Sequence, residues 1–178
     1  MIVSVCVVAY NEEKVLGKLL EDIQAQDYDH GKMEVVLIDS MSTDSTKEIM
    51  DRFQQQMTDF KNVQVLKNPG KKQASGWNVA IKNFSGDVMI RVDAHASIPP
   101  EFVRKNVEIL ESGEMVSGGP RPNMIDESTP WKETLLLAEQ SMFGSSNGFL
   151  QKKSKETVCQ ISFSWCVSKR SFGESRWV

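Results

Sequence analysis

The chain has 178 residues, of which 40% are hydrophobic and 25% are charged. This balance predicts a folded globular chain with an apolar core, and it excludes disorder as the dominant state. The 21 basic and 24 acidic residues give a formal net charge of -3, which argues against a broad nucleic-acid-binding surface. Because no apolar run approaches the roughly 18–20 residues of a membrane span and the start lacks a signal-peptide pattern, we expect a cytoplasmic protein.

Strands and helices are predicted to alternate from the start of the chain. Apolar, β-branched runs predict strands, and apolar residues at helical spacing predict the helices between them. Regular alternation implies right-handed crossovers and a mostly parallel sheet, so the expected fold class is α/β. The predicted strands cover 2–9, 33–38, 63–66, 88–92 and 115–117, and the predicted helices cover about 12–23, 45–57, 71–82, 99–110 and 130–143.

The first predicted helix has an apparent start signal. Asn11 is a residue type that caps helices, and Glu12 and Glu13 would then lie in the first turn, where carboxylates suit the helix dipole. We therefore expect the helix to begin directly after Asn11.

Ligands of such sheets bind at the carboxyl ends of the strands. This rule selects four segments of the sequence. The first strand is followed by neither GxGxxG nor GxxxxGK[ST], so a dinucleotide dehydrogenase and a P-loop ATPase fit poorly. The selected segments are 9–12, 39–40, 68–72 and 93–95.

Each polar group in these segments has an ordinary structural interpretation beside a functional one. Asp39 could cap a turn or accept a hydrogen bond from a base or a ribose. Lys71 and Lys72 could be a solvated pair or could compensate the charge of a diphosphate. Asp93 and His95 could be a turn aspartate and an exposed histidine, or the two could reach one divalent ion, for which manganese accepts mixed oxygen and nitrogen ligands.

Four ordered motifs resemble the amino-terminal half of family 2 glycosyltransferases, which have the GT-A nucleotide-sugar-binding fold. The resemblance covers about residues 2–157 and implies a mostly parallel sheet with flanking helices, truncated at the acceptor side. The form Asp-Ala-His, preceded by Arg91, is similar to succinoglycan-type glucosyltransferases of exopolysaccharide synthesis. The motifs are VVAYNEE (7–13), VLIDSMSTDST (36–46), GWNVAI (76–81) and GDVMIRVDAH (86–95).

The resemblance also implies roles for individual residues. Asp39 would meet the uracil edge, and Asp93 and His95 would stand at the first and last positions of the family's DxD metal motif. Asp93 would lie near the ribose or the metal, which would be Mn²⁺ or Mg²⁺. The remaining nucleotide-sugar-binding residues implied by position are Ala9, Tyr10 and Glu12 around the base and ribose, and Lys72 and Asn78 near the ribose and diphosphate.

The acceptor side of the family pattern is missing from this sequence. The family's catalytic base lies in a Glu-Asp motif beyond a Gly-Gly-Phe-Asp segment, and neither follows the metal motif here, so no catalytic residue is assigned. The last residues, 158–178, sustain no helix or strand period and form an atypical tail after a 1–157 donor-binding domain. We interpret the tail as out-of-frame sequence, with a short homologue that has a divergent end as the alternative.

The resemblance implies metal-dependent, inverting transfer of a sugar, with glucose expected, from a UDP-sugar to a polysaccharide or lipid-linked acceptor. The alternative is a truncated, non-catalytic remnant that binds nucleotide sugars. A nucleotidyltransferase fits less well, because residues 9–12 lack a glycine-rich basic signature. Nucleic acid is not an expected partner. Association with the inner face of the plasma membrane would depend on partners or on a missing carboxyl-terminal region.

Overall fold

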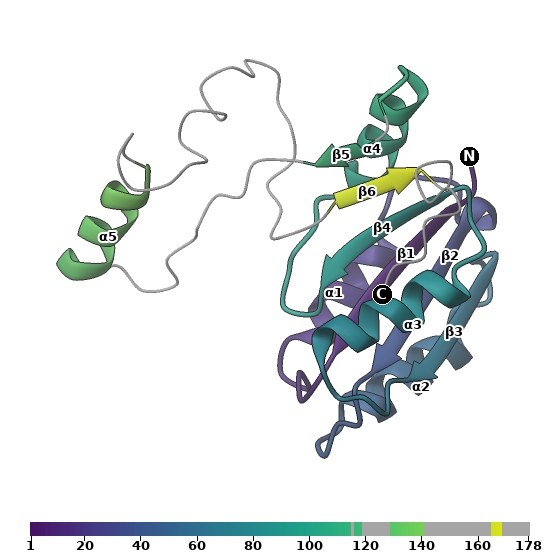
Figure 1. Ribbon diagram of the computed structural model, residues 1–178, viewed down its shortest axis with the longest axis horizontal. Helices are drawn as coiled ribbons and strands as arrows, with labels where there is room; N and C mark the ends of the chain where they lie inside the picture. The colour runs from purple at the N-terminus through teal and green to yellow at the C-terminus, as the bar shows by residue number, and fades with distance from the viewer. Residues whose placement is uncertain (115, 119–128, 141–164, 169–178) are drawn as a thin grey trace.

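A six-stranded sheet in the order β3-β2-β1-β4-β6-β5 forms the centre of the molecule (Figure 1). The computed structural model describes residues 1–114, 116–118, 129–140 and 165–168. The strands are β1 Val3–Ala9, β2 Met33–Asp39, β3 Asn62–Lys67, β4 Val88–Asp93, β5 Val116–Gly118 and β6 Trp165–Ser168. The helices are α1 Leu16–Gln24, α2 Thr46–Gln56, α3 Gln73–Asn83, α4 Phe102–Glu111 and α5 Pro130–Gln140, with a 3-10 turn at His30–Lys32.

The pairing of the strands confirms the predicted α/β class. Strand β1 pairs in parallel with β2 and β4, and β2 pairs in parallel with β3. Strand β6 is antiparallel to both β4 and β5. The sheet is therefore mostly parallel, with helices packed against both of its faces (Figure 1).

Apolar side chains fill both faces of the sheet, because successive residues of a strand point to opposite sides. On one face, α1, α2 and α4 contribute buried residues such as Leu19, Met50 and Phe102 to the larger core. On the other face, Trp77 and Ala80 of α3 pack on a smaller apolar cluster from β1, β2 and β4. All seven residues of β2 are buried, as expected for a strand covered on both sides.

The predicted start of the first helix was wrong. Helix α1 begins at Leu16, and the residue before it, Val15, makes no side-chain capping bond. Asn11 has a φ of 54°, and its side-chain oxygen accepts a hydrogen bond from the amide of Thr43 instead. A tertiary contact with the loop after β2 therefore replaces the local helix cap that the sequence suggested.

The tail contains a strand that the sequence pattern did not indicate. Strand β6 lies between β4 and β5, with Ile90 paired to Cys166 and Ser117 also paired to Cys166. Backbone hydrogen bonding along the edge of β4 decides this placement, and it needs no side-chain period. The other residues of 158–178 lie outside the described part of the chain, and the out-of-frame origin of the tail stays a prediction that the coding DNA would test.

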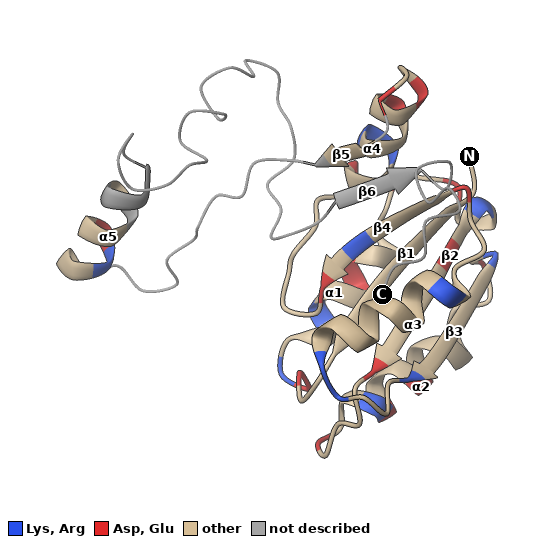
Figure 2. Ribbon diagram, in the orientation of Figure 1, with Lys and Arg blue, Asp and Glu red and all other residues tan. Residues whose placement is uncertain are grey.

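Charged residues of both signs are interspersed along the described ribbon (Figure 2). Helix α5 exposes three large apolar side chains, Trp131, Leu135 and Leu137; its predicted continuation to Phe143 lies outside the described residues. Within the described segments, no helix has both the length and the apolar character that crossing a bilayer requires.

Candidate functional site

The candidate site lies beside β1, where the order in which successive strands are added to the sheet reverses. The register sets Val8 of β1 beside Asp93 of β4, and Ala9 of β1 beside Asp39 of β2. Strands β2 and β3 continue the sheet on one side of β1, whereas β4 lies on the other side. The carboxyl ends of β1 and β4 therefore form a topological switch point, the position at which open α/β sheets bind ligands.

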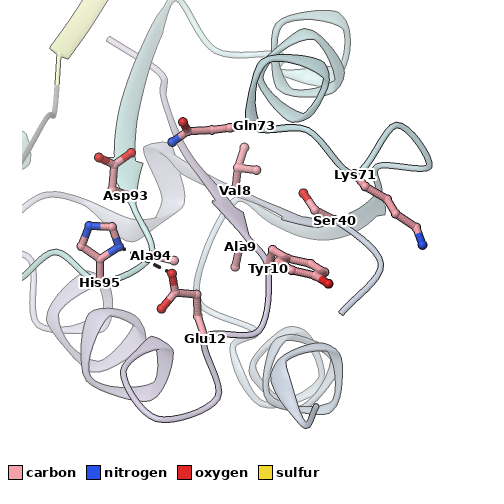
Figure 3. Close-up of a pocket in the computed structure, with 10 residues that line it drawn as sticks. All are labelled: Val8, Ala9, Tyr10, Glu12, Ser40, Lys71, Gln73, Asp93, Ala94 and His95. Atoms are coloured by element: carbon pink, nitrogen blue, oxygen red, sulfur yellow. Dashed lines mark ion pairs between the residues drawn. The ribbon is translucent and has the colours of Figure 1, made fainter. Parts of the chain in front are cut away.

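A pocket opens at this switch point (Figure 3). Its walls come from the end of β1, the end of β4, the residue after β2, and the start of α3. The lining residues are Val8, Ala9, Tyr10, Glu12, Ser40, Lys71, Gln73, Asp93, Ala94 and His95.

Five residues to which the family resemblance gave a nucleotide-sugar or metal role line this pocket together. Ala9, Tyr10 and Glu12 come from β1 and the loop after it, and Asp93 and His95 come from the end of β4. Tyr10 leaves 51% of its surface exposed, so its ring is available to a planar ligand.

Three selected residues have side chains outside the pocket lining. Asp39 is 3% exposed, and its Oδ1 accepts the amide hydrogen of Ser42 at 3.0 Å. Lys72 is exposed and directly precedes α3, and its neighbours Lys71 and Gln73 line the pocket in its place. Asn78 is exposed on α3.

Asn68 supports the pocket, although the sequence analysis gave its side chain no individual role. Its amide nitrogen donates to the hydroxyl of Ser40 at 3.0 Å and to the carbonyl of Lys72 at 2.9 Å. Its side-chain oxygen accepts from the hydroxyl of Ser75 at 2.8 Å. In the sequence, Asn68 stood at the start of the selected segment 68–72 and in a chain-breaking Asn-Pro-Gly turn. The structure adds that its side chain joins the loops after β2 and β3.

Backbone strain is concentrated at this end of the sheet. Among the described residues, Asn11, Met41 and Lys71 are the non-glycine residues with positive φ, at 54°, 63° and 58°. They follow β1, β2 and β3, respectively. Such conformations cost free energy and persist where the surrounding structure holds them, often at functional sites.

Hydrogen bonds between the loops after β1 and β2 hold this arrangement. The amide of Glu12 donates to the hydroxyl of Thr46 at 2.8 Å, and the amide of Ser45 donates to the carboxylate of Glu13 at 3.1 Å. Asp44 accepts from the amides of Glu13 and Thr46. Desolvation acts to raise the pKa of Asp44, but hydrogen bonds, chiefly those from Thr46, outweigh it and lower the pKa. The loop therefore favours an ionised Asp44.

An ion pair and a histidine–carboxylate contact position the groups at the end of β4. Nη2 of Arg91 lies 3.2 Å from Oδ1 of Asp93, and the Arg91 guanidinium lies over the ring of Trp77 at 4.5 Å. Nδ1 of His95 lies 3.6 Å from Oε1 of Glu12, and these two side chains face each other in Figure 3. Carboxylates and an imidazole thus meet in one solvent-accessible pocket.

A divalent cation at this pocket would need a phosphate ligand as well as protein groups. Within the described residues, no group of three His, Cys, Asp or Glu side chains is placed to hold a metal ion by itself. Asp93 and His95 both line the pocket, and Mg²⁺-type ions are commonly held by one or two protein groups together with substrate phosphates. These two residues would hold the metal, whose other ligands would come from a diphosphate.

Sequence comparisons connect the chain to enzymes that handle activated sugars. It is 28% identical over 156 residues to a dolichyl N-acetyl-alpha-D-glucosaminyl phosphate 3-beta-D-2,3-diacetamido-2,3-dideoxy-beta-D-glucuronosyltransferase of Methanococcus voltae. The matched region covers 85% of this chain and 48% of the relative. It is 32% identical over 146 residues to an undecaprenyl-phosphate 4-deoxy-4-formamido-L-arabinose transferase of Pseudomonas syringae, and this match covers 80% of this chain and 43% of the relative. The chain thus spans less than half the length of these relatives.

Solved structures show the same fold. The structure of S. aureus TarS 1–349 in complex with UDP-GlcNAc matches with a TM-score of 0.62 and 26% identity, over 73% of this chain and 37% of that TarS 1–349 chain. The mannosyltransferase PcManGT from Pyrobaculum calidifontis, in complex with GDP-Man and Mn²⁺, matches with a TM-score of 0.64 and 27% identity, over 67% of this chain and 35% of that protein.

The family model described as glycosyl transferase family 2 matches residues 4–172. This match includes β6 and extends past residue 157, where the motif resemblance ended. With the sheet topology, the pocket at the switch point and the structural neighbours, it identifies the chain as a member of glycosyl transferase family 2.

Proposed function

We propose that this chain supplies the donor site of a glycosyltransferase that transfers a hexosyl group, glucose, from a UDP-sugar to a polysaccharide or lipid-linked acceptor. The observation that carries the proposal is the pocket itself. It brings an exposed aromatic ring, Tyr10, to the same cavity as a cation, Lys71, and two metal-ligand candidates, Asp93 and His95. A base, a diphosphate and a divalent ion each find a matching group there.

The base and ribose would lie over β1 and β2. Tyr10 offers a ring face for stacking. Asp39 uses Oδ1 to accept the Ser42 amide, and its second carboxylate oxygen would accept the imide hydrogen of uracil. Glu12 would accept hydrogen bonds from ribose hydroxyls.

The diphosphate would lie between the start of α3 and the end of β4. Lys71 lines the pocket there, and Lys72 follows it directly. Helix α3 begins at Gln73, and the free amide groups of a helix N-terminus favour anions. A divalent cation at Asp93 and His95 would stabilise the nucleoside diphosphate as it leaves. Mn²⁺ suits this pair better than Mg²⁺, because one ligand is an imidazole nitrogen.

The reaction outcome and the acceptor are part of the same proposal. We infer inversion from the resemblance to inverting members of the family, and a succinoglycan-type exopolysaccharide acceptor from the Arg91-to-His95 form of the metal motif. The related Pseudomonas syringae enzyme is named for undecaprenyl-phosphate, which supports a lipid-linked acceptor and a peripheral position at the inner face of the plasma membrane.

Binding without transfer is the second candidate function. It requires only the donor pocket, whose lining groups suit a nucleotide sugar. Turnover of a UDP-sugar on a lipid-linked acceptor supports the first function. UDP binding with Mn²⁺ but no turnover at high protein concentration supports the second.

Calorimetric titration of UDP, with and without Mn²⁺, tests the donor site. Asp93→Ala is expected to abolish the Mn²⁺-dependent part of UDP binding, because it removes a carboxylate from the pocket. Asp87→Ala is the matched control: Asp87 directly precedes the start of the same strand and bonds the amide of Ile2. UDP binding that is unchanged in Asp93→Ala, or equally impaired in Asp87→Ala, would overturn the assignment.

A further inference from the structure

Arg91 is a cation placed directly behind the metal-ligand candidates. It lies on β4 two residues before Asp93, so both side chains point to the α3 face of the sheet. Its guanidinium lies 4.5 Å from the centroid of the Trp77 ring, and Nη2 is 3.2 Å from Oδ1 of Asp93. Only 19% of the Arg91 side chain and 10% of the Asp93 side chain are exposed.

The interaction between Arg91 and Trp77 depends on the face of the ring. Among the described residues, neither Nε of Arg91 nor the indole nitrogen of Trp77 has a hydrogen-bond partner, although both atoms are buried. Trp77 is only 9% exposed, so its ring is a fixed surface against which the guanidinium rests. Within the described segments, Asp93 is the acidic partner of Arg91.

This arrangement opposes the binding of a free divalent cation. A cation at Asp93 would share the carboxylate with a full positive charge, in a place where solvent screens the repulsion only partly. The second candidate ligand, His95, is itself 3.6 Å from the carboxylate of Glu12. A bound diphosphate would offset the repulsion between the metal and Arg91, because its negative charge attracts both the metal and the guanidinium.

We propose that Arg91, held by Trp77, suppresses divalent-cation binding at Asp93 until a nucleoside diphosphate is present, so that the site takes up cation and nucleotide together. Arg91 is thus a positioning residue that selects the metal–nucleotide complex over the free metal. The inference rests on the proposed function, because it requires that nucleotide diphosphates bind this pocket.

The test is a titration of Mn²⁺ followed by electron paramagnetic resonance, without UDP and with saturating UDP. For the unaltered protein, UDP is expected to tighten Mn²⁺ binding at least about tenfold, which corresponds to about 1.4 kcal/mol of coupling. Arg91→Met should tighten the binding of Mn²⁺ alone by at least about tenfold, and it should reduce the factor by which UDP tightens Mn²⁺ binding. Because coupling is reciprocal, Mn²⁺ should also enhance UDP affinity less in this variant.

Matched variants separate charge, ring and general effects. Arg91→Lys keeps the charge and should keep weak binding of Mn²⁺ alone. Trp77→Phe keeps a ring face and loses no hydrogen bond, so it should behave like the unaltered protein, whereas Trp77→Leu should shift in the direction of Arg91→Met. Arg104→Met removes the same charge from an exposed position on α4 and should leave Mn²⁺ binding unchanged.

The outcomes are distinguishable. If Arg91→Met binds Mn²⁺ alone no more tightly than the unaltered protein, the inference is wrong. If Arg91→Met does not fold by circular dichroism, Trp77→Leu decides the question in the same titration. If UDP fails to bind the unaltered protein under any Mn²⁺ concentration, the proposed function fails. If UDP binds normally but its coupling to Mn²⁺ is the same in all folded variants, only the role of Arg91 fails.

Discussion

Asn68 is predicted to stabilise both the fold and the shape of the donor pocket, so that one substitution should weaken both. Its side chain is 1% exposed and makes three hydrogen bonds, to Ser40 at 3.0 Å, Lys72 at 2.9 Å and Ser75 at 2.8 Å. At about 1 kcal/mol each, their loss in Asn68→Ala would cost about 3 kcal/mol. The Ser75 hydroxyl also donates to the Lys72 carbonyl, which recovers part of this, so we expect about 2–3 kcal/mol.

The same substitution should weaken nucleotide binding. The turn that Asn68 holds contains Lys71, whose φ is 58°. Without that support the strained turn relaxes, and restoring it on binding would cost about 1–3 kcal/mol. We therefore expect UDP affinity to fall at least about fivefold.

Urea unfolding monitored by circular dichroism measures the first effect, and calorimetric titration with UDP measures the second. Asn83→Ala is the control, because Asn83 lies exposed at the end of α3 and its side-chain amide donates to the Val79 carbonyl one turn back. This variant should change the free energy of unfolding by no more than about 0.5 kcal/mol. The reasoning is refuted if Asn68→Ala costs no more than Asn83→Ala, or if it lowers stability while UDP affinity stays the same.

Two further predictions concern packing and pH. A methyl group on Gly76 would meet Cγ1 of Val8 at 2.6 Å, so Gly76→Ala should destabilise the fold by about 1–3 kcal/mol. Gly17 has open space around it in α1, so Gly17→Ala should stabilise the fold by about 0.5–1 kcal/mol. Equal changes of the two variants in urea unfolding would contradict this argument. Glu34 is 1% exposed; desolvation acts to raise its pKa, but hydrogen bonds from Ser4 and other neighbours outweigh it and lower the pKa below 4.5. The stability that ionised Glu34 contributes is thus present above about pH 4.5 and lost as pH falls through the lowered pKa. Glu34→Gln should therefore flatten the acid limb of a curve of unfolding free energy against pH, and lower that free energy at neutral pH by about 2–4 kcal/mol. An unchanged acid limb would show that Glu34 does not cause the loss of stability in acid.

Much of the fold could be predicted because local patterns carried it. The strand from Met33 to Asp39 is apolar almost throughout, and the structure buries every residue of it. The helical spacing of Leu16, Leu19 and Ile23 matches the buried face of α1. Where a local signal competed with a tertiary contact, as at Asn11, the tertiary contact decided the structure.

The candidate site was predictable only in part. Tyr10, Asp93 and His95 follow strand ends, and the rule for parallel sheets brings such residues together. No sequence period could show that Asn68 would join two loops, or that Arg91 would rest on Trp77, because these contacts join residues from different elements.

By itself, the sequence determined that the chain is an α/β protein with its ligand groups at the carboxyl ends of the strands, since side-chain period and strand order along the chain are local properties. Only the tertiary structure decided which groups face the pocket. It placed Lys71 there and left Lys72 and Asn78 outside the lining, and it set β6 between β4 and β5. The physical reason is that side-chain direction at a loop and pairing at a sheet edge depend on hydrogen bonds to residues distant in the sequence.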